Sequence, residues 1–436
     1  MRSDVTFFNE ALVKIAALLA KIKFPKGAHP LVIRDIYGRI RIALPVDRSK
    51  HEDIAGRLQA KMTELGAFAG EGGGVLFNDD FFDPDSIFQD SGILDLYLPG
   101  SDKPIRILDR QVVGQDWLLP KSQIPRQPRL VFFGIKGGVG RSTAMAILAY
   151  TLAQSGKRVL LVDFDLESPG LSGLLLPPDR LADFGLVDWF IEDAVGQGDI
   201  VRERMISVSP LSEYTQGEIR VAAAMGLNEA FYLDKLSRVY ADVPRQGHVE
   251  KFSDRSRRLL AELEDIEKPD VVLIDSRAGL HDLAAVSIVG LATRALLFAV
   301  DSAQTWQGYE LLFNHWRAYP SVLKVIRDRL TMIEALFPEV DQAMRAERFL
   351  DSAYTMFSNT IYESIEPGQE PDPDIFNFDM NDMSAPHYPF RIKWNNQFQE
   401  FDPLMLSKGI MTEADIAAAF GDFLEGIKVL IEGNEP

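Results

Sequence analysis

A short segment in the middle of the chain combines glycines, cations and hydroxyls at a spacing that suits phosphate binding. It reads Lys136-Gly137-Gly138-Val139-Gly140-Arg141-Ser142-Thr143 and lies between an apolar run at 130–133 and a stretch with helical spacing. Glycines let the backbone wrap closely around an anion, so that successive N–H groups and the N-terminus of the next helix point at it. The Ser142 hydroxyl stands where a phosphate loop ligates Mg²⁺, and Thr143 can reach another phosphate oxygen.

Carboxylates follow two further apolar runs. Asp163 and Asp165 come at the end of 159–162, and Asp275 comes at the end of 271–274. Parallel strands end at the same edge of a sheet, so these acids are predicted to lie beside the glycine-rich loop. Carboxylates at that place suit a bound Mg²⁺ and an attacking water. The alternative is that they cap a helix or lie in a solvated turn.

The elements that would position these residues alternate between buried strands and helices. Continuous apolar runs separated by helical stretches are typical of a mostly parallel sheet covered by helices on both faces. The sequence therefore predicts an α/β fold from residue 129 onward. Its expected strands and helices are Leu130–Phe133, Ser142–Gln154, Arg158–Val162, Ile219–Ala223, Phe252–Glu264, Val271–Ile274, Ala295–Val300, Asp341–Ile365, Pro389–Trp394 and Thr412–Ile431.

The chain of 436 residues is long enough for two or three domains. Residues 1–120 are predicted to form a small α+β domain, with a helix within 7–22 and a hairpin within 31–44. Residues 121–128, which are rich in proline and polar side chains, are predicted to be a linker. The α/β domain then occupies 129–436, with helical additions at its C-terminal end.

Composition narrows the possible partners and chemistry. The chain has no cysteine, which excludes disulfides and thiolate metal sites and agrees with a cytoplasmic protein. The net charge of −18 lies entirely in residues 129–436, since the first 128 residues carry equal numbers of acids and bases. Such a charge disfavours binding to nucleic acid or to anionic lipid, although a local basic patch is not excluded. Residues 422–436 carry four acidic residues and one lysine, unlike a basic membrane anchor.

The glycine-rich segment resembles the deviant Walker A motif of the MinD/ParA ATPases, which belong to the SIMIBI class of P-loop proteins. More narrowly, it is similar to the KGGVGR-motif variant group, because Arg141 replaces the usual P-loop lysine and Ile135 replaces the first glycine. The resemblance implies a P-loop NTPase fold, ATP and Mg²⁺ as ligands, and a homodimer with ATP at its interface. It further implies that Lys136 reaches across that interface to the phosphates of the other subunit.

The two acidic strand ends resemble the switch segments of the same family. The resemblance implies that Asp165 orients the attacking water, that Asp163 lies near the metal, and that Asp275 holds the magnesium hydration shell. Residues 275–279 match the D-x-x-x-G pattern of switch II, in which the amide of Gly279 senses the terminal phosphate. Arg277 is either a charge-stabilising arginine or part of a surface salt bridge.

Three functions remain open at this point. The leading hypothesis is an ATPase that acts as a nucleotide-controlled dimerisation switch and regulates a protein partner, in a bacterial defence or conflict system by analogy. Arg141 leaves normal hydrolysis, slow hydrolysis, or binding with little turnover as possible outcomes. The second hypothesis is therefore an ATP-binding scaffold, and the third is a partition or positioning ATPase that acts on DNA or a membrane.

Overall fold

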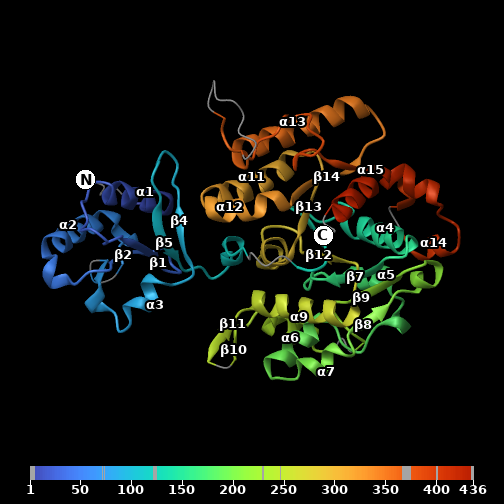
Figure 1. Cartoon of the computed structure of the whole chain (residues 1–436), viewed down its shortest axis with the longest axis horizontal. Helices are drawn as coiled ribbons and strands as arrows, with labels where there is room; N and C mark the ends of the chain where they lie inside the picture. Colours follow the sequence, from blue (N-terminus) through green and yellow to red (C-terminus); the bar gives the residue numbers. More distant parts are fainter. Residues whose placement is uncertain are drawn as a thin grey trace. The chain divides into compact units, whose positions relative to one another are not determined.

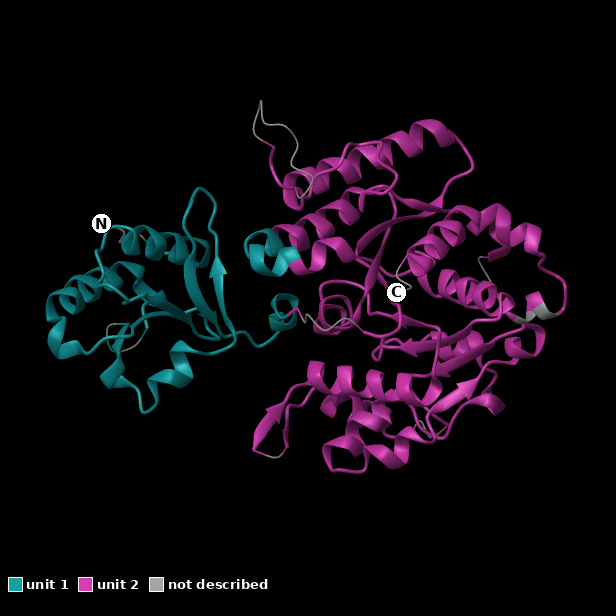
Figure 2. Ribbon diagram, viewed as in Figure 1, with its two compact units in different colours: residues 1–119, 315–324 teal, residues 120–314, 325–436 magenta. Residues whose placement is uncertain are grey.

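The computed structural model describes residues 5–70, 72, 74–120, 125–227, 230–245, 247–365, 375–398 and 401–433. Residues 121–124 of the predicted linker lie outside this set. The chain divides into two compact units (Figure 2). Unit 1 comprises residues 1–119 and 315–324, and unit 2 comprises 120–314 and 325–436. The sequence predicts a domain boundary near residue 120, but it does not predict that the later segment 315–324 belongs to unit 1.

Unit 1 is built on a mixed sheet, whose described strands run in the order β3-β2-β1-β5-β4. β1 and β2 pair antiparallel, which confirms the predicted hairpin, whereas β1 and β5 pair parallel. The late segment joins this unit through Trp316, whose Nε1 donates to the carbonyl of Trp117 at 3.0 Å. The elements are α1 Phe8–Leu19, β1 Leu31–Arg34, β2 Ile40–Leu44, α2 Glu52–Met62, β3 Val75–Phe77, α3 Pro84–Phe88, β4 Ile93–Leu96 and β5 Ile105–Asp109.

Unit 2 is built on a larger sheet, whose described strands run in the order β15-β14-β13-β6-β12-β7-β9-β8 (Figure 1). Every pairing is parallel except that of β8 with β9. The predicted mostly parallel sheet is thus confirmed. The strands are β6 Arg129–Gly134, β7 Arg158–Asp163, β8 Ile206–Val208, β9 Glu218–Ala222, β12 Val271–Asp275, β13 Arg294–Ala299, β14 Leu330–Phe337 and β15 Phe390–Lys393, with a separate hairpin of β10 Val243–Arg245 and β11 His248–Glu250.

Helices cover both faces of this sheet. Adjacent residues of a strand point to opposite faces, so two neighbouring residues of β6 report which helix lies on each face. Phe132 contacts the ring of Phe423 from α15, whereas the next residue, Phe133, contacts Tyr309 from α11. Both strand residues are fully buried. The helices are α4 Arg141–Gln154, α5 Leu171–Leu175, α6 Leu186–Ala194, α7 Gly198–Arg202, α8 Tyr232–Val239, α9 Phe252–Glu267, α10 Asp282–Ala285, α11 Ala303–Arg317, α12 Pro320–Ile326, α13 Gln342–Thr360, α14 Leu404–Ser407 and α15 Glu413–Glu432.

None of the helices in the described ranges combines the length and the apolar character that crossing a bilayer requires.

A close helix-to-strand contact at α15 generates a stability prediction. A Cβ atom at Gly426 would lie 2.3 Å from the ring of Phe390 on β15, whereas a Cβ atom at Gly421 of the same helix would meet nothing within 4 Å. We expect Gly426→Ala to lower the free energy of unfolding by about 1–3 kcal/mol through overpacking. Gly421→Ala should raise it by up to about 1 kcal/mol, because alanine favours the helix. Urea unfolding of both variants measures the contrast, and equal effects would contradict this packing.

Candidate functional site

The predicted phosphate loop connects the end of β6 to the start of α4. Gly138 and Gly140 have φ of +75° and +79°, in the left-handed region that favours glycine. Gly140 is also the N-cap residue of α4, so Arg141, Ser142 and Thr143 form the first helical turn. The loop therefore leads directly into a helix N-terminus, where unsatisfied backbone N–H groups favour an anion.

A hydrogen bond joins this helix turn to the neighbouring strand. The Ser142 hydroxyl lies 3.0 Å from Oδ2 of Asp275, the last residue of β12. The register brings the acids together, because β12 pairs with β6 on one side and pairs Asp275 with Asp163 of β7 on the other. The amide of Phe164 also donates to the carbonyl of Asp275, at 3.0 Å. The structure thus places the loop hydroxyl and both acidic strand ends at one edge of the sheet.

The three predicted carboxylates lie inside this edge rather than in solvent. Asp163 is fully buried and Asp275 is almost so. Burial raises the pKa of Asp163, and the charges of Asp275 and Asp165 raise it further. Burial also raises the pKa of Asp275 to about 6, against the opposing effects of Arg141 and the Ser142 hydroxyl. Burial likewise raises the pKa of Asp165, although Arg141 and Arg277 act to lower it.

One buried oxygen of each carboxylate accepts no hydrogen bond from the described residues, namely Oδ2 of Asp163 and Oδ1 of Asp165 and Asp275. Such an orphaned oxygen is costly unless a ligand, an ion or water satisfies it. A hard cation satisfies it well, since Mg²⁺ takes oxygen ligands and keeps several waters and substrate phosphates in its shell. Within the described ranges no group of three or more His, Asp or Glu side chains forms a closed metal cage. The donor set of Ser142 and Asp275 therefore fits a magnesium ion shared with phosphates.

The arginine that replaces the P-loop lysine is engaged by the protein itself. Arg141 is buried, and its Nη1 donates to the carbonyl of Ser276, the residue after β12. Its Nη2 lies 3.9 Å from Oδ2 of Asp165. The guanidinium therefore links the two acidic segments, in place of extending freely toward a phosphate.

The lysine at the start of the loop is exposed. Its Nζ donates to Oε1 of Gln304, in the first turn of α11. Gln304 was not predicted, because no motif marks a neutral residue that far along the chain. Asp301, two residues after β13, also lies near this turn, and it pairs with Arg348 and with the indole of Trp306.

The segment after Asp275 folds back onto the loop. The amide of Gly279 donates to the carbonyl of Gly134 at 3.0 Å, and Gly279 itself has φ of +84°. That amide is thus already bonded in this structure, whereas the resemblance assigns it to a terminal phosphate. Arg277 lies 2.5 Å from Glu167 through Nη1 and Oε2, and Glu167 also accepts a hydrogen bond from Tyr240 at 2.5 Å. Tyr240 was not predicted, because it lies outside every recognisable motif.

The loop and the acidic strand ends lie in a part of the chain that matches a known family. Residues 130–357, more than half of the chain, match the profile of the CobQ/CobB/MinD/ParA nucleotide binding domain. The chain belongs to this family, and its unit 2 carries a nucleotide-binding domain of the P-loop NTPase fold.

Individual relatives are more distant. The chain is 31% identical over 171 residues to the antiactivator FleN of Pseudomonas aeruginosa, which is 38% of this chain and 49% of FleN. The chain therefore spans about half the length of that curated relative. Among solved structures, pNOB8 ParA has a TM-score of 0.42 and 18% identity, covering 71% of this chain and 100% of that one. An ATP complex of a McdA variant from Cyanothece has a TM-score of 0.43 and 14% identity, covering 72% and 99%.

The raised pKa of Asp275 predicts a pH-dependent stability. At about pH 4 this carboxyl is neutral when folded and roughly half ionised when unfolded, whereas above pH 6 the folded state carries a buried charge that the unfolded state exposes to water. The contribution of Asp275 to the stability of the wild type should therefore decline as pH rises from about 4 to 6. Asp275→Asn removes the charge and should raise the free energy of unfolding by about 1–3 kcal/mol at pH 7.5. At pH 4 its effect should be small.

Urea unfolding of the nucleotide-free protein at both pH values measures this difference. Asp193→Asn is the matched control, because arginine partners lower the pKa of Asp193. That variant should lose stability at pH 7.5. An Asp275→Asn variant that is less stable than the wild type at pH 7.5 would contradict a net destabilising buried charge at Asp275.

Proposed function

We propose that this chain binds ATP with Mg²⁺ in unit 2 and hydrolyses it, and that the bound nucleotide controls the pairing of two copies. The observation that carries the proposal is the 3.0 Å bond between Ser142 and Asp275, beside a glycine-rich helix N-terminus and orphaned carboxylate oxygens. This combination provides amides for phosphate oxygens and oxygens for a hard cation, which is what a Mg·nucleotide needs.

Each residue of the site then has a defined task in the proposal. The amides of Gly137–Thr143 cradle the phosphates, and Ser142 and Asp275 hold the metal together with the nearby Asp163. A bound Mg²⁺ neutralises negative charge on the phosphate oxygens. Asp165 orients a water, and Lys136, which is exposed, is free to exchange Gln304 for a phosphate of a second copy.

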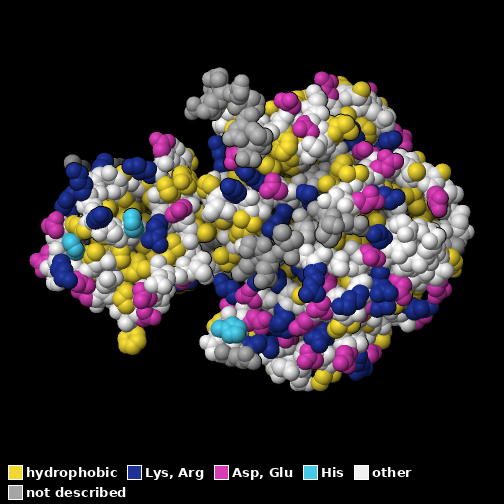
Figure 3. Space-filling model, in the orientation of Figure 1, with side chains coloured by type: hydrophobic (Ala, Val, Ile, Leu, Met, Phe, Trp, Pro, Cys, Tyr) yellow, Lys and Arg dark blue, Asp and Glu magenta, His cyan; other side chains and the backbone are white. Residues whose placement is uncertain are grey.

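A protein partner is proposed in preference to DNA or a membrane. The net charge of −18 opposes long-range attraction of a phosphate backbone. On the face drawn in Figure 3, Lys and Arg side chains of unit 2 lie among Asp and Glu side chains, without one uninterrupted basic patch. Regulation of such a partner and action in a defence system remain predictions from the resemblance, and action in the cytoplasm remains a prediction from the composition.

An ATP-binding scaffold with little turnover is the second candidate, and the position of Arg141 favours it. Its guanidinium bonds to the Ser276 carbonyl and faces Asp165, so it links two acidic segments of the site and is not directed at a phosphate. This candidate predicts saturable ATP binding, phosphate release at background level, and little recovery in Arg141→Lys.

Steady-state phosphate release distinguishes the two candidates. If the chain is an ATPase, the wild type should release phosphate in a Mg²⁺-dependent reaction, and Lys136→Ala, Asp165→Ala and Asp275→Ala should each lower the rate by about 100-fold or more. Lys408→Ala, which changes an exposed lysine, is the control and should retain wild-type turnover. Wild-type rates in all three site variants would reject these assignments.

The pairing of two copies is tested separately. Light scattering after size exclusion should report a larger particle with Mg²⁺ and a non-hydrolysable ATP analogue than with ADP or without nucleotide. Lys136→Ala should abolish that change, while Lys408→Ala should preserve it. The same mass under every condition would contradict a nucleotide-controlled dimer.

A further inference from the structure

Arg277 lies in a short segment beside the candidate nucleotide site. It belongs to the segment that begins at Asp275, which bonds Ser142, and ends at Gly279, whose amide bonds the carbonyl of Gly134. Both ends of this short segment are thus attached to the phosphate loop or its adjoining strand. Arg277 also lies close enough to Asp165 for its charge to lower the pKa of that carboxyl.

The guanidinium of Arg277 forms an ion pair through one of its nitrogens. Its Nη1 lies 2.5 Å from Oε2 of Glu167, but the buried Nη1 makes no well-aligned hydrogen bond. Within the described part of the chain, no acceptor contacts its Nε or Nη2, and 32% of the side chain is exposed. The group therefore retains donors for a ligand while its position is fixed by an ion pair.

Glu167 is in turn held by a segment outside the loop and the switches. Its Oε1 accepts a hydrogen bond from the Tyr240 hydroxyl at 2.5 Å. The adjacent carbonyl of Leu166 accepts one from the Tyr232 hydroxyl at 2.7 Å. Two tyrosines from residues 232–240 therefore fix two consecutive residues that follow Asp165.

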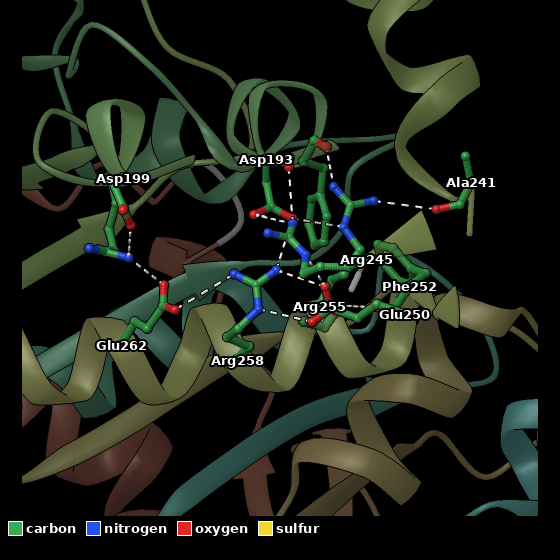
Figure 4. A network of polar contacts seen from close by, with 12 residues as sticks. Asp193, Asp199, Ala241, Arg245, Glu250, Phe252, Arg255, Arg258 and Glu262 are labelled. Atoms are coloured by element: carbon green, nitrogen blue, oxygen red, sulfur yellow. Dashed lines mark hydrogen bonds and ion pairs between the residues drawn. The ribbon is translucent and has the colours of Figure 1, made fainter. Parts of the chain in front are cut away.

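The residues that flank Tyr240 contact Arg255, which belongs to the network of ionic contacts drawn in Figure 4. Arg255 is fully buried, and its Nη1 lies 3.4 Å from the carbonyls of both Val239 and Ala241, the residues that flank Tyr240. Its Nε donates to Asp193 at 3.0 Å. The Tyr240 ring also packs edge-on against Phe252, with centroids 5.2 Å apart. Glu167 is thus oriented by a tyrosine whose ring and flanking carbonyls have contacts of their own in unit 2.

We propose that Arg277 binds the terminal phosphate of ATP, and that Glu167, oriented by Tyr240, is the residue that positions Arg277 for this contact. The inference rests on the proposed binding of ATP. It accounts for the replacement of the P-loop lysine, since Arg141 is engaged by Ser276 and Asp165 and a second cation is left to meet the terminal phosphate. A guanidinium suits this task, because its fork of donors matches a phosphate.

Competition binding measures the inference without any turnover. A fluorescent ADP derivative bound in the presence of Mg²⁺ is displaced by unlabelled ADP or by AMP-PNP. Of these two competitors, only AMP-PNP carries a third phosphate, which corresponds to the terminal phosphate of ATP. We expect Arg277→Ala to weaken the binding of AMP-PNP by about tenfold or more, and to leave the affinity for ADP within about twofold of the wild-type value. Glu167→Gln and Tyr240→Phe should weaken AMP-PNP in the same selective way, the tyrosine variant less strongly.

A double variant tests whether Glu167 acts by positioning Arg277 or by its own charge. In the Arg277→Ala background, Glu167→Gln should no longer weaken AMP-PNP, because the residue that it positions is absent. Arg180→Ala is the matched control, since it breaks an exposed 2.9 Å ion pair with Glu213 in the same unit. Its ratio of the two affinities should equal that of the wild type. Unchanged ADP affinity shows in each case that the variant is folded.

The outcomes distinguish this inference from the proposed function. A wild type that binds neither nucleotide overturns both. A wild type that binds both, with the same ratio in Arg277→Ala, overturns the role of Arg277 alone. If Arg277→Ala selectively loses affinity for AMP-PNP and Glu167→Gln does not, the role of Glu167 is overturned.

Discussion

The bond between the Ser142 hydroxyl and the Asp275 carboxylate is the constraint on which the site depends. It ties the first turn of α4 to the end of β12 and thereby holds the phosphate loop at the edge where Asp163 and Asp165 also lie. The parallel order of the strands makes this convergence unavoidable, because their carboxyl ends meet at one edge. The price is a set of buried carboxylates with orphaned oxygens, which a magnesium nucleotide would satisfy.

Two arginines with different degrees of burial lie beside this edge, and they are called the inner and the outer layer below. Arg141 lies inside and links the two acidic segments, whereas Arg277 lies further out and keeps donors available. The outer layer is anchored through Glu167 and Tyr240 to the network of Arg255 and its neighbours, well away from the loop. The site is therefore supported by a segment between β9 and α9 that carries no nucleotide motif.

Much of unit 2 was predictable, for a physical reason. Strands buried on both faces read as apolar runs, and the glycine-rich loop requires a strand before it and a helix after it, so β6, α4, β7 and β12 were predicted within one or two residues. The partners of the site were not predictable, because Gln304 and Tyr240 contact Lys136 and Glu167 only through the tertiary fold. The membership of residues 315–324 in unit 1 was missed for the same reason, since the contact of Trp316 with Trp117 leaves no local pattern.

The most direct measurement of the central claim is a calorimetric titration of the folded chain with ATP, in the presence of Mg²⁺ and again with the metal chelated. If Ser142 and Asp275 hold a metal that the phosphates share, binding should saturate at one nucleotide per chain with Mg²⁺ and weaken by about tenfold or more without it. Absence of heat and of saturation with Mg²⁺ would contradict the account, and so would equal affinity in the two conditions.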